Sequence, residues 1–278
     1  MPRYALTISY DGTRFHGWQR QVNGSNVQEL LAGAILPLCK DGPVSLYASG
    51  RTDAGVHAHG QVVHFDMERV LTPEKLRRAI NDALPPDIQV LDARAVADDF
   101  HARKSVRVKE YRYTIYNAET MPPCHRLYAA HVRTPINLDA LRAAAERFVG
   151  RHDFAAFSAN PRRELASTVR TVFSLDVASR PADLQPAIFP SSIFPPSDLQ
   201  PPDLPPPDIP PPATIITLAV RGEGFLYKMV RSIAGFLIAV GTGREPPEAV
   251  TEILATRVRT ARVESAPPQG LTLWRVEY

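Results

Sequence analysis

Cysteine is almost absent from this sequence of 278 residues, which contains only Cys39 and Cys124. Two cysteines provide neither a disulfide framework nor a four-thiolate metal site. The sequence also lacks an apolar run of 18 residues, so it predicts no membrane span, and it opens as a strand rather than as a charged and apolar leader. These absences indicate a protein of the reducing cytoplasm that has no membrane partner.

Neither sign of charge is in large excess, because 32 lysines and arginines oppose 29 aspartates and glutamates, for a net charge of +3. The balance is uneven, since residues 181–213 hold four aspartates and no lysine or arginine. The whole chain carries +3 and this segment −4, which leaves +7 on the remainder. A moderately basic body suits a polyanionic partner such as a nucleic acid, and charge that only maintains solubility is the alternative.

Proline is concentrated in the same segment, 181–213, which contains 13 of the 27 prolines. This density removes amide donors and favours extended polyproline II, so we expect neither a helix nor an inner strand there. Residues 171–177 and 214–220 on either side have the composition of strands. We therefore predict an expanded, acidic and disordered hairpin loop; a ligand for a proline-binding module is the functional alternative.

A polar loop bracketed by glycines holds a single carboxylate, Asp53, within the sequence SGRTDAGVHA at 49–58. Strand-like residues 44–48 precede the loop and 61–65 follow it, so the carboxylate is expected at a rigid edge that a substrate can reach. Asp53 is therefore the first candidate for a catalytic residue. An aspartate that only caps the amides of its own turn is the structural alternative.

This loop resembles the signature of the TruA family of tRNA pseudouridine synthases, Gly-Arg-Thr-Asp-Ala-Gly-Val-His. Other segments are similar to further landmarks of the family and follow in the family's order: 10–13, 15–21, 99–103, 111–113, 224–231 and 270–276. The resemblance implies an isomerase that converts uridine to pseudouridine in the anticodon arm of tRNA, at uridines 38 to 40. It also implies a homodimer that uses no cofactor and no metal.

The resemblance assigns roles to five residues of this chain. Asp53 is expected to be the nucleophile that acts on a flipped-out uridine, with Arg231 as its ion-pair partner. Tyr111 is expected to stack on the target base. Arg51 would contact an RNA phosphate or the flipped nucleotide, and Leu271 would form part of the apolar wall of the pocket.

The chemistry is consistent with a site built on one carboxylate. Pseudouridine formation breaks the C1′–N1 bond, turns the uracil and rejoins it through C5, which requires no redox change. Asp53 fits two roles in this reaction, a nucleophile or a base for a sugar-derived intermediate. A nearby guanidinium orients a carboxylate and favours its charged form, and an aromatic ring holds an extruded base. The residues alone also allow structural roles. Arg231 fits an arginine whose stem covers an apolar helix while its charged end reaches water, and Tyr111 fits an aromatic residue of the core.

Basic and aromatic side chains along the chain are the candidates for RNA binding, and each also fits an ordinary solvated surface residue. They are Arg14, His16, Trp18, Arg20, Lys104, Arg107, Lys109 and Arg112.

Other functions fit the sequence less well. A first cluster of possible zinc ligands consists of His57, His59, His64 and Asp66, but no second cluster follows in the sequence. A glycosidase would need a second catalytic carboxylate, which no spacing assigns. Neither cysteine has the context of a hydrolase nucleophile. A non-catalytic RNA-binding protein is the main alternative to an enzyme, although the intact run from Arg51 to Asp53 favours activity.

Hydrophobic alternation and helix-capping residues predict an α+β chain with two similar halves, 1–103 and 104–278. Residues 4–10 and 110–116 alternate in the same way, as strands do. Helices are predicted from Asn26 to before Pro37, from Pro73 to Leu84 with Thr72 as the cap, and from Asn137 through Phe148. The resemblance implies ferredoxin-like (RRM-like) halves with a continuous antiparallel sheet, flanking helices and a central cleft, as in the pseudouridine synthase fold.

Overall fold

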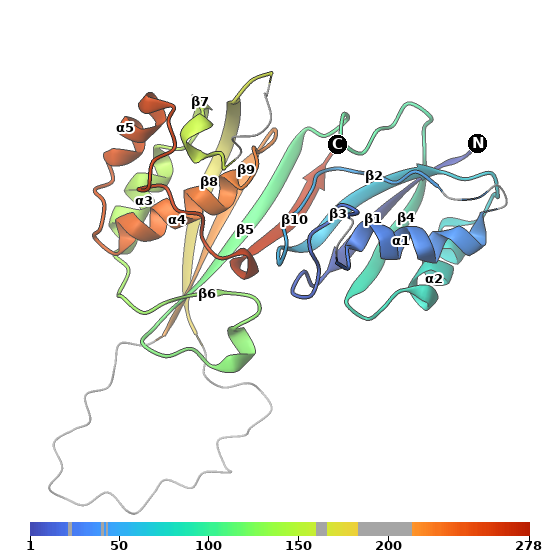
Figure 1. The fold of residues 1–278 in the computed structure, drawn as a ribbon, viewed down its shortest axis with the longest axis horizontal. Coiled ribbons are helices and arrows are strands. Elements are labelled where there is room, and N and C mark those ends of the chain that lie inside the picture. The colour runs from blue at the N-terminus through green and yellow to red at the C-terminus, as the bar shows by residue number, and fades with distance from the viewer. Residues whose placement is uncertain (22–23, 40–41, 43, 160–165, 183–212) are drawn as a thin grey trace, which may run out of the picture.

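A ten-stranded sheet runs through the whole molecule in the computed structural model, which describes residues 1–21, 24–39, 42, 44–159, 166–182 and 213–278 (Figure 1). The N-terminal part contributes four strands and two helices, which are β1 (Arg3–Tyr10), α1 (Val27–Ile35), β2 (Tyr47–Ala48), β3 (His57–Asp66), α2 (Pro73–Ala83) and β4 (Ile88–Val96). β1 pairs antiparallel with both β3 and β4, and the short β2 pairs with β3.

The C-terminal part contributes the other six strands and three helices. In chain order they are β5 (Val108–Asn117), β6 (Ala130–Val132), α3 (Leu138–Glu146), β7 (Gly150–Asp153), β8 (Val169–Pro181), β9 (Thr214–Gly222), α4 (Met229–Gly241), α5 (Ala249–Thr256) and β10 (Leu271–Glu277). The order across the sheet is β4-β1-β3-β10-β5-β9-β8-β7. The helices of this part lie apart from α1 and α2, toward the other end of the sheet (Figure 1).

β10 joins the two parts, because the last strand of the chain lies between β3 and β5. It runs antiparallel to β5 but parallel to β3, with Thr272 opposite His57 and Leu273 opposite Ala58. Since β3 and β5 point in opposite directions, a strand inserted between them must be parallel to one of the two. The predicted α+β fold with a continuous sheet is confirmed, and the sheet is antiparallel apart from this joint and the β5–β6 pair.

Capping residues begin the helices where the sequence predicted them. Thr72 Oγ1 accepts a hydrogen bond from the Lys75 amide at 3.4 Å, and Pro73 is the first residue of α2. Asn137 Oδ1 accepts from the first turn of α3 at 3.0 Å. α3 ends at Glu146, two residues before the predicted end, because helical hydrogen bonding gives way to turns before the strand β7.

A single row of buried side chains crosses the sheet on its core face. Tyr10, Ala58, Leu273, Tyr111 and Val220 are cross-strand neighbours on β1, β3, β10, β5 and β9. All five belong to one hydrophobic core that also includes residues of α1, α2, α3 and α4. The helices of both parts therefore cover the same face of the sheet, and this shared core brings distant segments together.

The proline-rich segment connects two paired strands. β8 and β9 pair up to Pro181 opposite Thr214, and the Ala182 amide donates to the Ala213 carbonyl at 2.7 Å. β8 thus continues four residues beyond the predicted strand end at 177. The loop predicted between these strands falls on residues 183–212, which lie outside the described residues. In the described part of the chain, no helix has the length and apolar character needed to span a membrane.

Candidate active site

Asp53 lies in the loop between β2 and β3, and backbone hydrogen bonds fasten this loop to residues 15–18. The Trp18 amide donates to the Thr52 carbonyl and the Gly55 amide to the Phe15 carbonyl, each at 3.2 Å. Gly17, with a φ of 93°, makes this approach possible, because a Cβ there would lie 2.5 Å from the Thr52 carbonyl oxygen. The backbone on either side of Asp53 is therefore held in place.

Buried polar side chains hold the rest of the loop in place. Thr52 Oγ1 and Tyr10 Oη lie 2.8 Å apart in a hydrogen bond. Gln61 Nε2 donates to the Gly50 carbonyl at 2.8 Å, and Ser49 Oγ donates to Gln61 Oε1 at 2.5 Å. Such a network satisfies groups that would be costly to bury alone and leaves the loop with one conformation.

Arg231 forms an ion pair with Asp53, as the resemblance implied. Its Nη1 lies 3.1 Å from Asp53 Oδ2, and its Nε donates to the Ala266 carbonyl at 2.8 Å. Only 12% of the Arg231 side chain and 20% of the Asp53 side chain are exposed. Arg231 stands in the first turn of α4, three residues after the cap residue Lys228, whose φ of 56° is rare for a residue with a side chain. A guanidinium held at two atoms orients the carboxylate tightly.

Tyr111 lies beside this ion pair on β5. Burial, and then the charge of Asp53, raise the pKa of the Tyr111 phenol, so the phenol is neutral at physiological pH. Phe225 meets its ring edge to face at 5.2 Å, and only 8% of Tyr111 is exposed. The ring is thus close to Asp53 but nearly enclosed. Tyr113, two residues further on, is a core residue whose hydroxyl donates to the Pro267 carbonyl at 2.9 Å.

Neither of the other two predicted site residues forms a hydrogen bond or an ion pair with the Asp53 side chain in the described part of the chain. Arg51 is exposed in the same loop and forms no ion pair with any described residue. Leu271 is buried, opposite Tyr113 at the start of β10. The structure therefore brings Asp53, Arg231 and Tyr111 together.

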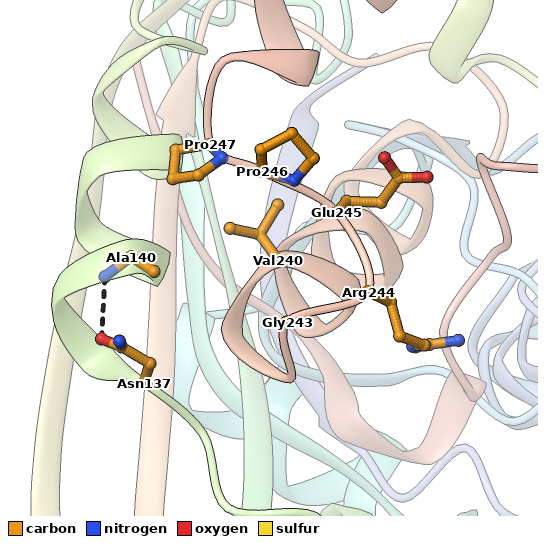
Figure 2. Close-up of a pocket in the computed structure, with 8 residues that line it drawn as sticks. All are labelled: Asn137, Ala140, Val240, Gly243, Arg244, Glu245, Pro246 and Pro247. Atoms are coloured by element: carbon orange, nitrogen blue, oxygen red, sulfur yellow. Dashed lines mark hydrogen bonds between the residues drawn. The ribbon is translucent and has the colours of Figure 1, made fainter.

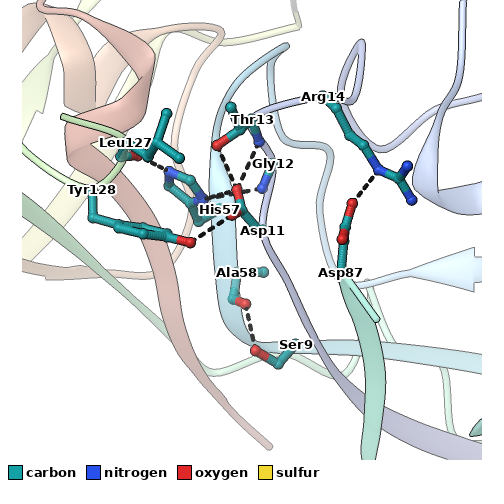
Figure 3. A network of polar contacts seen from close by, with 10 residues as sticks. All are labelled: Ser9, Asp11, Gly12, Thr13, Arg14, His57, Ala58, Asp87, Leu127 and Tyr128. Carbon is teal, nitrogen blue, oxygen red and sulfur yellow. Dashed lines mark hydrogen bonds and ion pairs between the residues drawn. The ribbon is translucent and has the colours of Figure 1, made fainter. Parts of the chain in front are cut away.

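A polar network next to the Asp53 loop was not predicted from the sequence (Figure 3). His57 Nδ1 accepts from the Gly12 amide at 3.0 Å, which leaves Nε2 to donate to the Leu127 carbonyl at 2.8 Å. Tyr128 donates to Asp11 Oδ2 at 2.6 Å. Burial alone would raise the pKa of Asp11, but hydrogen bonds from Thr13 and Tyr128 outweigh it and lower the pKa. The network ties the loop before β6 to the end of β1.

The histidines considered for zinc binding do not converge. Both nitrogens of His57 are hydrogen-bonded, His64 Nδ1 accepts from the Ala102 amide at 3.1 Å, and His59 stacks on Trp274. Within the ranges that the structure describes, no group of three or more histidine, cysteine or acidic side chains is placed to hold a metal.

A hollow of about 380 Å³ lies between α3 and the end of α4, away from these residues (Figure 2). Asn137, Ala140, Val240 and residues 243–247 line it. None of the predicted site residues is among them, and its acid, Glu245, already pairs with Arg262.

The candidates for RNA binding differ widely in their surroundings. Trp18 is buried at 3% exposure and belongs to the core, so it does not face an RNA surface. Arg14 and Arg20 pair with carboxylates, and Arg112 lies over the ring of Trp274. Lys104 and Arg107 are exposed, and His16 is exposed in the segment against the Asp53 loop. Lys109 is partly buried beside that loop.

Comparison with known proteins identifies the chain's relatives. The sequence profile of the tRNA pseudouridine synthase family matches residues 6–103 and 144–278. The tRNA pseudouridine synthase A of Syntrophotalea carbinolica is 42% identical over 98% of this chain and 95% of its own length. The enzymes of that name from Chlamydia trachomatis and Listeria monocytogenes are 38% and 37% identical, over 99% and 100% of this chain and 92% and 100% of their own lengths.

The profile match includes Asp53 and Arg231 but omits residues 104–143, so the position of Tyr111 rests on the structure and on the full-length relatives. An arginine-paired aspartate in a rigid loop is consistent with the single-carboxylate chemistry expected from the sequence. Because the match spans most of the chain and the relatives cover it almost completely, this protein belongs to the tRNA pseudouridine synthase family.

Proposed function

We propose that this protein converts uridine in tRNA to pseudouridine, with Asp53 as the catalytic residue. The observation that carries the proposal is the ion pair between Asp53 and Arg231, 3.1 Å long and largely buried, with Tyr111 beside it. Membership of an isomerase family that acts on tRNA supports the reaction class.

Asp53 acts as the nucleophile at C1′ of a flipped-out uridine. As the carboxylate bonds to C1′, the C1′–N1 bond breaks and its electron pair leaves with the uracil. The uracil turns, C5 bonds to C1′, and the carboxylate departs with its own pair. C5 then loses its proton and N1 gains one, so the product is an isomer of the substrate and no cofactor is consumed.

Arg231 positions the carboxylate for this attack. Its guanidinium is fixed by the Ala266 carbonyl and donates to Oδ2 of Asp53. Oδ1 accepts no hydrogen bond from a described residue and is available to C1′. A near-attack geometry of this kind accounts for a large part of enzymatic rate enhancement.

Tyr111 provides the aromatic surface for the target base. Since its phenol stays neutral, the residue acts through its ring and its hydroxyl rather than as an anionic base. The side chains above the ring must move for a base to stack on it, because Tyr111 is almost enclosed. Arg51 contacts the RNA backbone near the flipped nucleotide, and Leu271 forms part of the apolar wall behind it.

The substrate position and the assembly follow from the resemblance. The target uridines are 38 to 40 of the anticodon arm, and the protein works as a homodimer in the cytoplasm. Residues 1–103 and 104–278 are its two structural halves, the second interrupted by the proline-rich segment. The basic remainder of the chain supports a polyanionic substrate.

Tritium release from tRNA labelled at C5 of uridine tests the proposal. We expect release by wild type in EDTA and none by Asp53→Asn, which is isosteric but cannot act as a nucleophile. Circular dichroism and tRNA binding of the variant serve as controls. Release by Asp53→Asn at the wild-type rate would contradict the role of Asp53. No release by wild type, with tRNA still bound, would support the non-catalytic RNA-binding alternative.

A further inference from the structure

Lys109 is a partly buried cation with no carboxylate partner among the described residues. It lies on β5 two residues before Tyr111, so both side chains point to the same face of the sheet. Its Nζ donates to the Ser49 carbonyl at 2.7 Å and forms no ion pair with any described residue. Burial first, and then the nearby charge of Arg103, lower the pKa of Lys109 to about 8.

Lys109 also reaches the loop that carries Asp53. A Cβ placed on Gly50 would lie 3.4 Å from Lys109 Nζ and 3.9 Å from Tyr111 Oη, so both side chains end close to the backbone of Gly50. Arg51 is the next residue of that loop. Neither Arg51 nor Arg103 pairs with a carboxylate among the residues described. Lys109, Arg51 and Arg103 together are called the Lys109 cluster.

The Lys109 cluster has no carboxylate within 4.0 Å of its charged groups among the described residues, whereas twelve arginines elsewhere in the described chain, Arg231 among them, have one. Removing an ammonium group from water without an anion is costly, and the nearby charge of Arg103 increases the cost. Of the three donors of the ammonium, Ser49 uses one, which leaves two for a ligand.

We propose that the Lys109 cluster binds a backbone phosphate of the tRNA, next to the nucleotide whose base contacts Tyr111. The proposal rests on the proposed function, because that function supplies the anion and places a nucleotide at Tyr111. A phosphate offers oxygens to the free donors of Lys109 and to the guanidinium groups of Arg103 and Arg51. It also replaces the solvation that the ammonium loses in the free protein.

The salt dependence of tRNA binding tests the proposal. Lys109→Met keeps the length of the side chain and removes the charge, and an Asp53→Asn background prevents turnover. We expect the affinity to fall about tenfold, as for a lost hydrogen bond to a charged group. The slope of log Kd against log salt should fall by about 0.7 to 0.9, which corresponds to one phosphate contact. Lys109→Arg should retain the wild-type slope.

Two further variants make the test independent of folding. Arg103→Ala changes an exposed residue of the cluster and should also reduce the slope. Because the residue is exposed, this reduction cannot come from a disturbed core. Lys75→Met, at an exposed lysine of α2, is the matched control and should leave affinity and slope unchanged. A wild-type slope in both Lys109→Met and Arg103→Ala overturns the proposal, even if affinity falls, because Lys109 would then only hold the Ser49 carbonyl.

The pH dependence of the same binding gives a second readout. Since the lowered pKa leaves Lys109 charged below about 8 and neutral above it, wild-type affinity should decline between pH 7 and pH 9. Arg103 also lies near this ammonium, and burial raises the pKa of Tyr111 and Tyr278 out of this range. Lys109→Arg should remove the decline. If tritium release by wild type fails, the proposed function fails; if it succeeds and these slopes do not change, only this inference fails.

Discussion

At the scale of single residues, the site depends on a contact between side chains 178 residues apart in the sequence, Asp53 and Arg231. The arginine can orient the carboxylate because a second acceptor, the Ala266 carbonyl, holds its Nε. A planar guanidinium reaches both acceptors at once, whereas an ammonium is a single point charge. The geometry of the site therefore requires arginine rather than any cation.

Arg231→Lys should lower the rate constant of tritium release about 100-fold, the usual cost of misplacing a reacting group by roughly 1 Å. The affinity for tRNA should change little, because the charge is kept. Single-turnover kinetics at saturating enzyme measures both quantities. Arg262→Lys, on an exposed arginine paired with Glu245, is the control, and a wild-type rate in Arg231→Lys would refute the positioning role.

At the scale of elements, the loop before β3 is set by its packing on residues 15–18 rather than by its own sequence. The Trp18 amide reaches the Thr52 carbonyl only because Gly17 has no side chain and adopts a positive φ. The Asp53 backbone is thus placed by a segment more than thirty residues away in the chain. Local glycine content predicted a loop here, and this contact determines its conformation.

Gly17→Ala should destabilise the fold by about 1–3 kcal/mol, because an alanine is strained at this φ and its Cβ would meet the Thr52 carbonyl oxygen. The shift of that carbonyl should also reduce tritium release. Urea unfolding measures the stability. Gly33→Ala is the matched control, since a Cβ on this α1 residue has no neighbour within 4 Å and should raise stability by about 0.5–1 kcal/mol. Equal effects of the two substitutions would refute the explanation.

At the scale of the whole molecule, two sets of contacts unite the N-terminal and C-terminal parts. β10 lies between β3 and β5 in the sheet, and the bonds of Tyr128 to Asp11 and of His57 to Leu127 cross between the parts. The segment 183–212, by contrast, joins β8 and β9 beyond a bond that already closes the hairpin. The sheet therefore does not need this segment for its own pairing.

Replacing residues 183–212 with Asn-Gly should leave stability and tritium release within about twofold of wild type, because a two-residue turn suits a hairpin closed by Ala182 and Ala213. Circular dichroism and the tritium assay measure the two properties. A control with a scrambled order of the same thirty residues separates sequence from length. Loss of folding or of activity in the Asn-Gly variant would assign the segment a structural or catalytic role.

Much of the fold was predictable, because its signals are local. The caps Thr72 and Asn137 begin their helices by bonding amides two or three residues away. The alternation in β1 and β5 predicted strands with one buried face. The long strand β8 and the register of β10 were not predicted, because pairing partners chosen over large sequence separations leave no local pattern.

The sequence by itself determined the family, the loop that carries Asp53 and the approximate positions of the helices that begin at Thr72 and Asn137, since these depend on residue identity over short stretches. The resemblance already implied that Arg231 meets Asp53, and the tertiary structure gave the geometry of this pair. Only the tertiary structure decided that Trp18 is in the core and that Lys109 is partly buried with no carboxylate partner among the described residues. The physical reason is that burial and electrostatic partners are properties of a packed core, in which segments 60 to 178 residues apart come into contact.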